Sequence, residues 1–449
     1  PPFIGGVGVW GLPNNWQSCF DGDAWTYVPE RGQYYYHFFM KQQPDLNWHN
    51  PEVKQAMWDA VRFWLDLGVD GFRLDAIGTI YEEPALTPHP VPMNHAQIRR
   101  ALDLAQTPKE KKQLWKNWYT MFKNQFGQPG LHELMKELRT ILGEYDGDRM
   151  LVGEDDDIAY MGDGNDELHL VFNFPLMRTE HLTPTFIRRN QLTRLQQLDT
   201  LPTRGWPCNT LGNHDSSRLR TRYGNKTNSL ELARLNAALV LTLRGTPFLY
   251  NGEEIGMTDL IITDPTLLRD TMATWYYATA VSDLQVPPAE AARHAGEMSR
   301  DKNRTPNQWR NAPNAGFSPA DVTPWLPVHP NYAEGINVQD QENDPDSLLN
   351  YYKRLIQVRK NSPALIAGEY RPLHENARAS FAFLRQTPEQ TVLVVLNYSD
   401  KRRLLAFDTN DLNGKQTARA VFSTHPDRPT ELLPRLHLAP YEGLIAELV

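Results

Sequence analysis

The sequence predicts an α/β protein in which a parallel (β/α) barrel is followed by a smaller antiparallel β domain. Short apolar stretches alternate with helical patterns over most of the chain, which is typical of parallel βα units. Polar clusters follow these stretches directly, at the strand ends where a barrel builds its active site. Past about Gly368 the helical patterns stop and strand-like stretches follow one another, which favours an antiparallel arrangement.

The length of the chain fits two folded units, because 449 residues exceed the roughly 250 to 300 at which a single core stops growing. The composition is typical of a globular protein, and no apolar run approaches the ~20 residues of a membrane span, so we expect no membrane contact. The formal net charge of −8 argues against a nucleic-acid partner, since phosphate binding needs a positive field. A neutral small-molecule substrate is compatible with this negative net charge.

Cys19 and Cys208 are the only cysteines. They exclude a disulfide framework and a cysteine zinc site but leave one bridge open. The compartment stays open on these grounds, with a cytoplasmic location as the default expectation. The chain starts with Pro1 and Pro2, without an initiator methionine or a signal-type segment, so we expect that its beginning is cut or omitted.

Residues 1–48 predict irregular, aromatic-lined structure with a candidate hairpin through Gly32 to Phe39. The barrel part follows over residues 49–368. It begins with an amphipathic helix that Asn50 can cap and that Gly68 stops. The apolar positions of this helix are Met57, Ala60, Val61, Trp64 and Leu65.

Five apolar stretches predict parallel strands, and they fit a barrel better than a random assortment. They are GFRLDA at 71–76, MLVGE at 150–154, HLVFNF at 169–174, CNTLGNHD at 208–215 and TPFLYNGEE at 246–254. Between them we expect helices after Thr107 and Pro108, around Leu131 to Leu142, and through Leu230 to Leu243.

A loop rich in proline, asparagine and tryptophan is expected from Arg300 to about Asp346, followed by a helix with an apolar face from Leu348 to Ile356. Residues 369–449 predict the antiparallel β domain. Its strand-like stretches are SFAFLR, TVLVVLNY, RRLLAF and GLIAEL.

Three acidic residues fall at three strand ends: Asp75, Glu154 and Asp215. Glycoside hydrolysis needs one carboxylate as nucleophile or base and one carboxylic acid as proton donor, supplied from different strands across a cleft. Arg73 shares a strand face with Asp75 and would keep that carboxylate ionised. Each motif taken alone has a simpler interpretation, such as a salt bridge at a barrel rim or an Asn-rich turn. The three in order favour catalysis.

These residues resemble the ordered strand-end motifs of the alpha-amylase superfamily of glycoside hydrolases. GFRLDA, LVGE and GNHD look like three of its motifs, and QPDLN at Gln43 to Asn47 resembles the motif of its oligo-1,6-glucosidase and alpha-glucosidase branch. Supporting stretches are NNWQS, GQYYYHFF, RTPNQW, NAGFS and QENDPDSLLNYYKRLIQVRK.

The resemblance implies a (β/α)8 TIM-type barrel in which the five visible strands are strands 4 to 8, and makes residues 1–48 the end of a loop domain inserted in the barrel. It implies Asp75 as a nucleophile that forms a covalent glucosyl intermediate and Glu154 as general acid and then base. For retention these two carboxyls should lie roughly 5 to 5.5 Å apart.

The resemblance further implies that Asp215 binds substrate hydroxyls and stabilises the transition state. Arg73, His214 and Arg300 would hold the terminal glucose.

In this branch the residue after the nucleophile resembles a linkage selector. Ala76 favours α-1,4 linkages such as that of maltose, and the alternative is a small packing residue. Asp155, Asp156 and Asp157 would raise the pKa of Glu154 if they lay close to it, and a solvated loop is the alternative interpretation.

The family's first three strands, an early Asn-His motif and an acidic calcium-like loop have no counterpart in this chain. We expect a C-terminal portion of a longer polypeptide, with a complementary N-terminal fragment as an expected partner. The chemistry requires no cofactor, and no metal ligands are assigned here. Any structural calcium would lie in the absent part.

Two rival functions stay open. A trehalose synthase-like isomerase is suggested by GFRLDA and by HLVFNFPLM at His169 to Met177. A non-catalytic barrel subunit, as in the transporter heavy chains that resemble this superfamily, would have lost the catalytic carboxylates, whereas all three remain here.

Overall fold

The computed structural model describes residues 11–20, 22–225, 227–408, 410–412, 414–425, 431–432 and 435–449. Pro1 and Pro2, and with them the expectation for the start of the chain, lie outside the described residues. The chain divides into two compact units, Pro1–Val171 with Ile261–Lys302, and Phe172–Leu260 with Asn303–Val449. The domain boundaries expected near residues 48 and 368 lie where the predicted type of structure changes, and they remain predictions.

The first unit starts with a segment rich in aromatic residues that contains two small pairs of antiparallel strands. β1 (Gln17–Ser18) pairs with β2 (Gly22–Asp23), and β3 (Trp25–Val28) pairs with β4 (Gln33–Tyr36). The hairpin lies earlier than expected: it is formed by Trp25–Tyr36, and only its second strand, β4, falls in the expected stretch Gly32 to Phe39. Trp16, Trp25 and Tyr36 are buried and pack on one another, which gives this segment a core of its own.

Several helices of the first unit begin at polar caps that the sequence supplies. Asn50 accepts the N–H of Glu52 at 2.9 Å at the start of the first helix, and Thr107 forms a capping box with Glu110 at the start of the third. These helices are α1 (Pro51–Asp66), α2 (His95–Leu104), α3 (Pro108–Phe122), α4 (Leu131–Leu142), α9 (Thr271–Ser282) and α10 (Pro288–Met298), with the short η1 (Ile77–Thr79), η2 (Ile158–Met161) and η3 (Pro265–Leu267).

The buried face of α1 differs from the expected one. Trp58 and Leu65 are buried, whereas Trp64 is 51% exposed. Trp58 Nε1 donates to Glu137 of α4, and Lys54 pairs with the same carboxylate at 2.8 Å. The contact with α4 therefore decides which side of α1 turns inward, and the apolar pattern alone does not.

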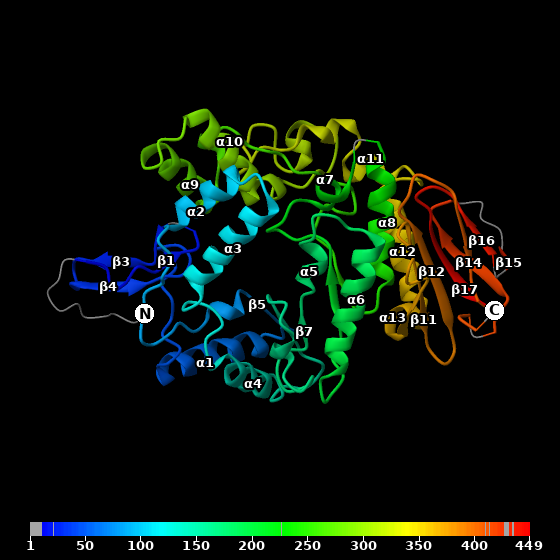
Figure 1. Ribbon diagram of the computed structural model, residues 1–449, viewed down its shortest axis with the longest axis horizontal. Helices are drawn as coiled ribbons and strands as arrows, with labels where there is room; N and C mark the ends of the chain where they lie inside the picture. Colours follow the sequence, from blue (N-terminus) through cyan, green and yellow to red (C-terminus); the bar gives the residue numbers. More distant parts are fainter. Residues whose placement is uncertain are drawn as a thin grey trace. The chain divides into compact units, whose positions relative to one another are not determined.

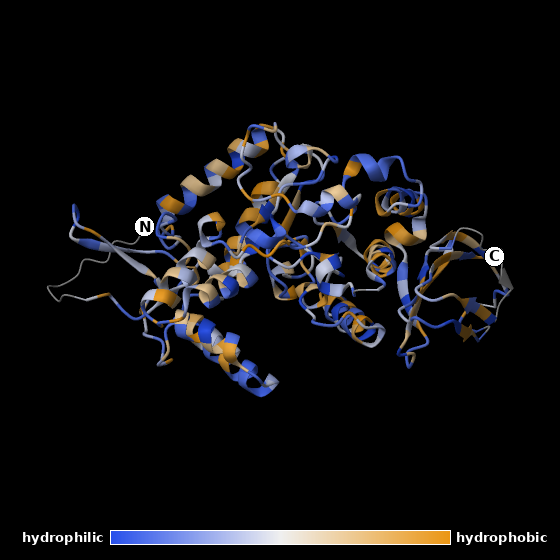
Figure 2. Cartoon of the chain, turned by 90° about the horizontal axis from the view of Figure 1, so that it is seen from above, coloured by the Kyte–Doolittle hydropathy of each residue, from blue (hydrophilic) through white to orange (hydrophobic). Residues whose placement is uncertain are grey.

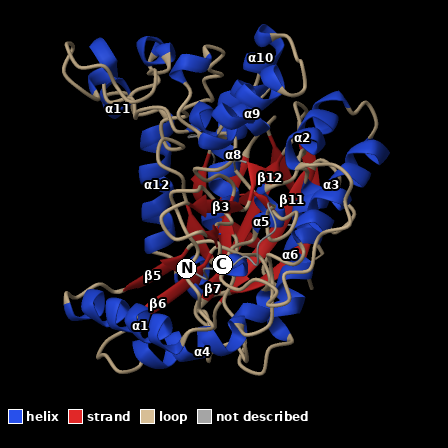
Figure 3. Ribbon diagram, turned by 90° about the vertical axis from the view of Figure 1, so that its left-hand side faces the viewer, coloured by secondary structure: helices blue, strands red, loops and turns tan. Residues whose placement is uncertain are grey.

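Three parallel strands follow the order of the chain in the first unit: β5 (Gly71–Leu74), β6 (Met150–Gly153) and β7 (Leu170–Val171). Figure 3 shows β5 and β6 side by side with α1 and α4 next to them. The expected helix-then-strand alternation is confirmed here. The parallel direction places the ends of β5 and β6 at one edge of the sheet.

The second unit contains the other two expected strands, β8 (Cys208–Thr210) and β9 (Thr246–Phe248), which pair in parallel. Phe172 forms a parallel bridge with Cys208. The helices of this part are α5 (Phe174–Met177), α6 (Pro184–Asp199), α7 (Leu219–Tyr223) and α8 (Ser229–Thr242).

The segment from Arg300 to Asp346 is mostly loop, as expected, with short helical turns. These are η4 (Arg300–Asn303), η5 (Pro313–Gly316), η6 (Pro330–Glu334) and α11 (Val338–Glu342). Ser347 then caps α12 (Leu348–Lys360), which covers the expected apolar positions from Leu348 to Ile356, and α13 (Pro363–Ala367) follows.

The C-terminal part is antiparallel, as expected. Its main sheet has the order β10-β11-β12-β17-β14-β15, and β13 pairs with β16. The bounds are β10 (Glu369–Leu373), β11 (Ser380–Gln386), β12 (Thr391–Asn397), β13 (Arg403–Ala406), β14 (Thr417–Ser423), β15 (Glu431–Leu432), β16 (Arg435–Leu438) and β17 (Gly443–Leu448).

Both faces of this main sheet are covered. Phe381 and Phe383 point to one face and pack in a core with α8, α12 and α13, which lie along the sheet in Figure 1. Ala382 and Leu384 point to the other face and pack with Leu405 of β13 and residues of β16. This is why β11 and β12 carry nearly continuous apolar runs instead of alternating apolar and polar residues. Figure 2 shows hydrophobic ribbon in this part of the chain, near the C-terminus.

Candidate active site

The ends of β5 and β6 bring two of the predicted carboxylates together. Leu74 lies opposite Gly153 in the parallel register, so Asp75 and Glu154 leave the sheet next to each other. The Glu154 N–H donates to the Leu74 carbonyl at 2.8 Å, and the Glu154 carboxylate accepts the Ala76 N–H at 3.0 Å. The two strand ends are therefore joined through backbone and side chain.

Arg73 contacts both carboxylates. Its guanidinium pairs with Asp75, and its other terminal nitrogen lies 3.0 Å from Glu154 Oε2. The i, i+2 spacing in the sequence predicts the first contact, and the structure adds the second. A guanidinium shared in this way orients both carboxylates.

Burial separates the two acids. The Glu154 side chain is 19% exposed and that of Asp75 is 74% exposed. Burial raises the pKa of Glu154 above its ordinary value, and Asp75 adds to the rise, while the Ala76 N–H and Arg73 oppose it. A general acid must keep its proton until it is needed, so the direction of this shift suits that role.

The three aspartates after Glu154 form a turn. Asp155 Oδ1 accepts the N–H groups of Asp156 and Asp157 at 2.7 and 2.8 Å, and Asp157 caps η2 through the N–H of Ala159. The pKa of Glu154 is set mainly by burial and by contacts with the residues around Asp75. Of the two interpretations of this run, the loop is the one observed.

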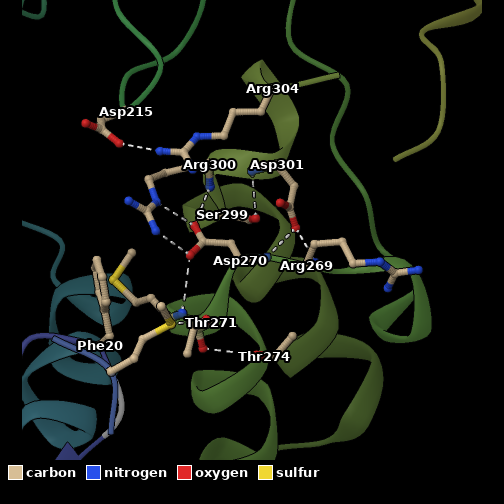
Figure 4. Close-up of polar contacts among 12 residues, drawn as sticks. Phe20, Asp215, Arg269, Asp270, Thr271, Thr274, Ser299, Arg300, Asp301 and Arg304 are labelled. Atoms are coloured by element: carbon tan, nitrogen blue, oxygen red, sulfur yellow. Dashed lines mark hydrogen bonds and ion pairs between the residues drawn. The ribbon is translucent and has the colours of Figure 1, made fainter. Parts of the chain in front are cut away.

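In the second unit, the loop after β8 carries His214 and Asp215. The Asp215 carboxylate lies 3.1 Å from His214 Nε2 and 2.6 Å from Arg304 Nη2. Its N–H donates to Asn213 Oδ1 at 3.0 Å. Figure 4 shows the Arg304 guanidinium directed at Asp215. The carboxylate is thus oriented by two basic side chains.

Arg304 is the residue that sequence reasoning did not single out. Its Nε donates to the His214 carbonyl at 2.8 Å, and Asn303 Nδ2 donates to the same oxygen at 2.8 Å. Arg304 opens the RTPNQW stretch, and the only signal was a basic residue in a loop that resembles the family. Spacing along the chain could not connect it to Asp215, 89 positions earlier.

Replacing Arg304 tests whether it orients Asp215. Arg304→Met is expected to lower kcat/KM by roughly 10- to 100-fold, because a charge-assisted hydrogen bond contributes about 1.5–3 kcal/mol. The unfolding midpoint should change little. Arg310→Met, at an exposed position of the same segment, is the control. Equal losses in both variants would show that Arg304 has no special role.

Arg300 is held by Asp270 within the first unit. Its N–H, Nε and Nη2 lie 2.8, 3.0 and 3.0 Å from the Asp270 carboxylate (Figure 4). Its guanidinium also lies 4.8 Å from the centre of the Phe20 ring. The predicted role of Arg300 in holding glucose remains a prediction, and the contact observed is an ion pair with a buried carboxylate.

Neither Cys19 nor Cys208 is part of a disulfide bridge. Among the described residues, no group of three or more His, Cys, Asp or Glu side chains could hold a metal ion. The calcium expectation concerns other residues and stays a prediction. In the same described part of the chain, no helix is both long and apolar enough to cross a membrane.

Comparisons with known sequences identify the family. A family model described as the catalytic domain of alpha amylase matches residues 6–368. An oligo-1,6-glucosidase of Parageobacillus thermoglucosidasius is 32% identical over 451 residues, which cover 97% of this chain and 75% of that protein. An alpha-glucosidase of Pediococcus pentosaceus is 34% identical over 403 residues, covering 83% and 67%.

Solved structures support the same family assignment. An isomaltulose synthase from Klebsiella sp. LX3 matches with a TM-score of 0.80 and 29% identity over 100% of this chain and 77% of that chain. A trehalose-6-phosphate hydrolase of Bacillus licheniformis matches with a TM-score of 0.77 and 29% identity over 97% and 76%. The expected TIM-type barrel fold with a C-terminal antiparallel domain is thereby confirmed. The chain belongs to the alpha-amylase family of glycoside hydrolases.

Proposed function

We propose that the chain is a retaining, exo-acting α-glucosidase that hydrolyses terminal α-glucosidic bonds of short oligosaccharides such as maltose. The observation that carries this proposal is the pair Asp75 and Glu154, which sit at adjacent strand ends and share Arg73. One acid is exposed and paired with a cation, and the other is more buried with a raised pKa. A retaining mechanism needs this division between nucleophile and proton donor.

In the proposed mechanism, a carboxylate oxygen of Asp75 attacks the anomeric carbon. The glycosidic C–O bond breaks, and the leaving oxygen takes the proton of Glu154. Water then attacks the same carbon, Glu154 accepts a proton from it, and the bond to Asp75 breaks. Two inversions give net retention, and the chemistry requires no cofactor because the chain supplies both carboxyl groups.

Asp215 is proposed to bind substrate hydroxyls and to stabilise the oxocarbenium-like transition state. Its orientation by His214 and Arg304 supports this role, because contacts with two side chains fix the direction of the carboxylate. Arg73, His214 and Arg300 are proposed to hold the terminal glucose. Ala76 supports a preference for α-1,4 linkages through the family resemblance.

The second candidate function is an isomerase in which the released sugar, instead of water, attacks the glucosyl intermediate. Solved structures of isomaltulose synthases and of a trehalulose synthase are among those most similar to this chain, which favours keeping this alternative. A trehalose synthase-like reaction belongs to the same class. The same carboxylates would serve in each case.

Products and their stereochemistry test the function. We expect glucose from maltose, released first as the α-anomer in a proton NMR time course, and slower turnover of isomaltose, sucrose and trehalose. β-Glucose as the first product would contradict the retaining mechanism. Trehalose from maltose, or an isomer from sucrose, would establish the isomerase instead. No turnover of any of these sugars would contradict both and leave the non-catalytic subunit.

A further inference from the structure

The turn after β9 carries an acid that the proposed mechanism does not use. Glu253 belongs to the YNGEE stretch and is 6% exposed. One of its carboxyl oxygens, Oε1, has no hydrogen-bond partner. A buried carboxylate in that state would carry a large uncompensated desolvation cost. The position therefore calls for an explanation.

Glu253 lies against the backbone of the loop that carries Asp215. A Cβ at Gly212 would be 2.2 Å from Glu253 Oε1 and 3.4 Å from its Cδ. The carbonyl of Gly212 accepts the Thr210 hydroxyl at 2.7 Å. Gly212 is thus enclosed between Thr210 and Glu253, three residues before Asp215.

The same turn holds this loop at a second point. The Tyr250 hydroxyl donates to the Asn303 carbonyl at 3.0 Å, and the Asn303 side chain donates to the His214 carbonyl at 2.8 Å. Tyr250 and Glu253 are themselves joined, because the Glu253 N–H donates to the Tyr250 carbonyl at 3.0 Å. One turn therefore fixes the residues on the amino side of Asp215 from two directions.

The groups around Glu253 favour its neutral form. Burial raises the pKa of Glu253 to about 8, and Glu254 adds to the rise, while the Tyr250 N–H and Arg218 oppose it. Tyr352 of α12 is 2% exposed and its hydroxyl has no partner. Burial also raises the pKa of Tyr352 well above its ordinary value, and Glu253 adds to the rise, so the Tyr352 hydroxyl stays protonated and neutral.

We propose that Glu253 is a positioning residue for Asp215 and that it acts as the neutral carboxylic acid. The neutral group fills the space over Gly212 without a charge that would draw water into the core. Ionisation would add a second negative charge behind the loop that carries Asp215 and would displace Gly212. This inference rests on the proposed role of Asp215 in substrate binding.

Three variants of the full chain test it. Glu253→Gln reproduces the neutral acid in shape and charge, and Glu253→Ala removes it. Glu389→Gln makes the same chemical change at an exposed turn of the second unit. Each is assayed for kcat/KM on maltose from about pH 5 to about pH 9, with an unfolding curve at each pH.

We expect Glu253→Gln to stay within about 3-fold of the unchanged protein near pH 6.5. At alkaline pH both proteins lose activity as Glu154 gives up its proton, but the unchanged protein should lose more because Glu253 ionises as well. Glu253→Ala should lose at least roughly tenfold at every pH, because the support of Gly212 is gone. A folded Glu253→Gln variant that is as impaired as Glu253→Ala would overturn the proposal.

The pH dependence of the folding constant gives a further test, because a side chain with a merely structural role would not change it. The pKa of Glu253 is about 8 in the folded chain against an ordinary 4.5, so the folded state binds the proton more tightly. Between these two values the unfolded chain has lost the proton and the folded chain keeps it. The folding constant of the unchanged protein should therefore fall about tenfold per pH unit relative to Glu253→Gln. A difference that does not vary with pH, as expected for Glu389→Gln, would contradict the neutral acid.

Hydrogen exchange separates this inference from the proposed function. Amides of the segment from Cys208 to Ser216 should exchange faster in Glu253→Ala than in Glu253→Gln, whatever sugar the protein acts on. Equal exchange in both variants would show that Glu253 does not fix this loop. Absence of turnover with normal exchange differences would instead count against the proposed function alone.

Discussion

Asp75→Asn is expected to lower kcat/KM for maltose by at least roughly 10⁴-fold, the scale on which removing a nucleophile acts in enzymes with covalent intermediates. Asparagine keeps the shape of the side chain and can still contact Arg73, but its amide oxygen is too weak a nucleophile to form the glucosyl intermediate. Steady-state kinetics with maltose, at matched protein concentrations, measure the loss. The unfolding midpoint should stay near that of the unchanged protein because the Asp75 side chain is 74% exposed.

Asp70→Asn is the matched control. Asp70 lies just before the other end of the same strand, its side chain is 94% exposed and it pairs with Arg149 at 3.1 Å. This variant should keep nearly full activity. An Asp75→Asn protein that retains more than about a tenth of the activity would show that the nucleophile lies elsewhere. Similar losses in both variants would point to damage of β5 instead.

Asp270→Asn is expected to lower the free energy of unfolding of the first unit by about 3–5 kcal/mol, the usual cost of breaking a buried ion pair from one side. The Asp270 side chain is 1% exposed and accepts three contacts from Arg300 as well as the N–H of Met272 at the start of α9. Asparagine leaves the guanidinium without its counter-charge. Denaturant curves, with hydrogen exchange of α9 and α10 as the local readout, measure the change.

The pH dependence of this effect has a definite sign. Burial alone would raise the pKa of Asp270, but the hydrogen bonds and charge of Arg300 outweigh it and hold the pKa below the ordinary 3.8. The stabilisation is therefore fully present above that value and is lost as the pH falls through the lower, folded-state pKa. Asp264→Asn, at an exposed helix cap in the same segment, should have a much smaller effect. Equal destabilisation by both variants would contradict the ion-pair explanation.

The local elements followed from the sequence because their signals are local. Asn50 and Thr107 start their helices where their side chains can accept backbone N–H groups of the first turn. The apolar stretches at β5, β6 and β8 became strands for the same reason: short, apolar segments bounded by glycine and polar residues have few alternatives. The face of α1 was beyond this reasoning, since the partner α4 comes 65 or more residues later.

The meeting of Asp75 and Glu154 could be predicted because it needs only two facts that the sequence supplies: each residue follows a strand, and the strands are parallel. Arg73 could likewise be placed beside Asp75 by the period of a strand. Its second contact with Glu154 required the actual register of β5 against β6. A shift of that register by one residue would have turned the side chains to the other face.

The sequence by itself thus determined the family, the strand ends and the acids that they carry, because these depend on neighbours along the chain. Only the tertiary structure decided which distant residues hold those acids: Arg304 on Asp215, Asp270 on Arg300, and Glu253 behind Gly212. The tertiary structure likewise decided the pKa values of the buried acids. Burial gives Glu154 and Glu253 their raised pKa values, and burial is a property of the packed chain that no short motif contains.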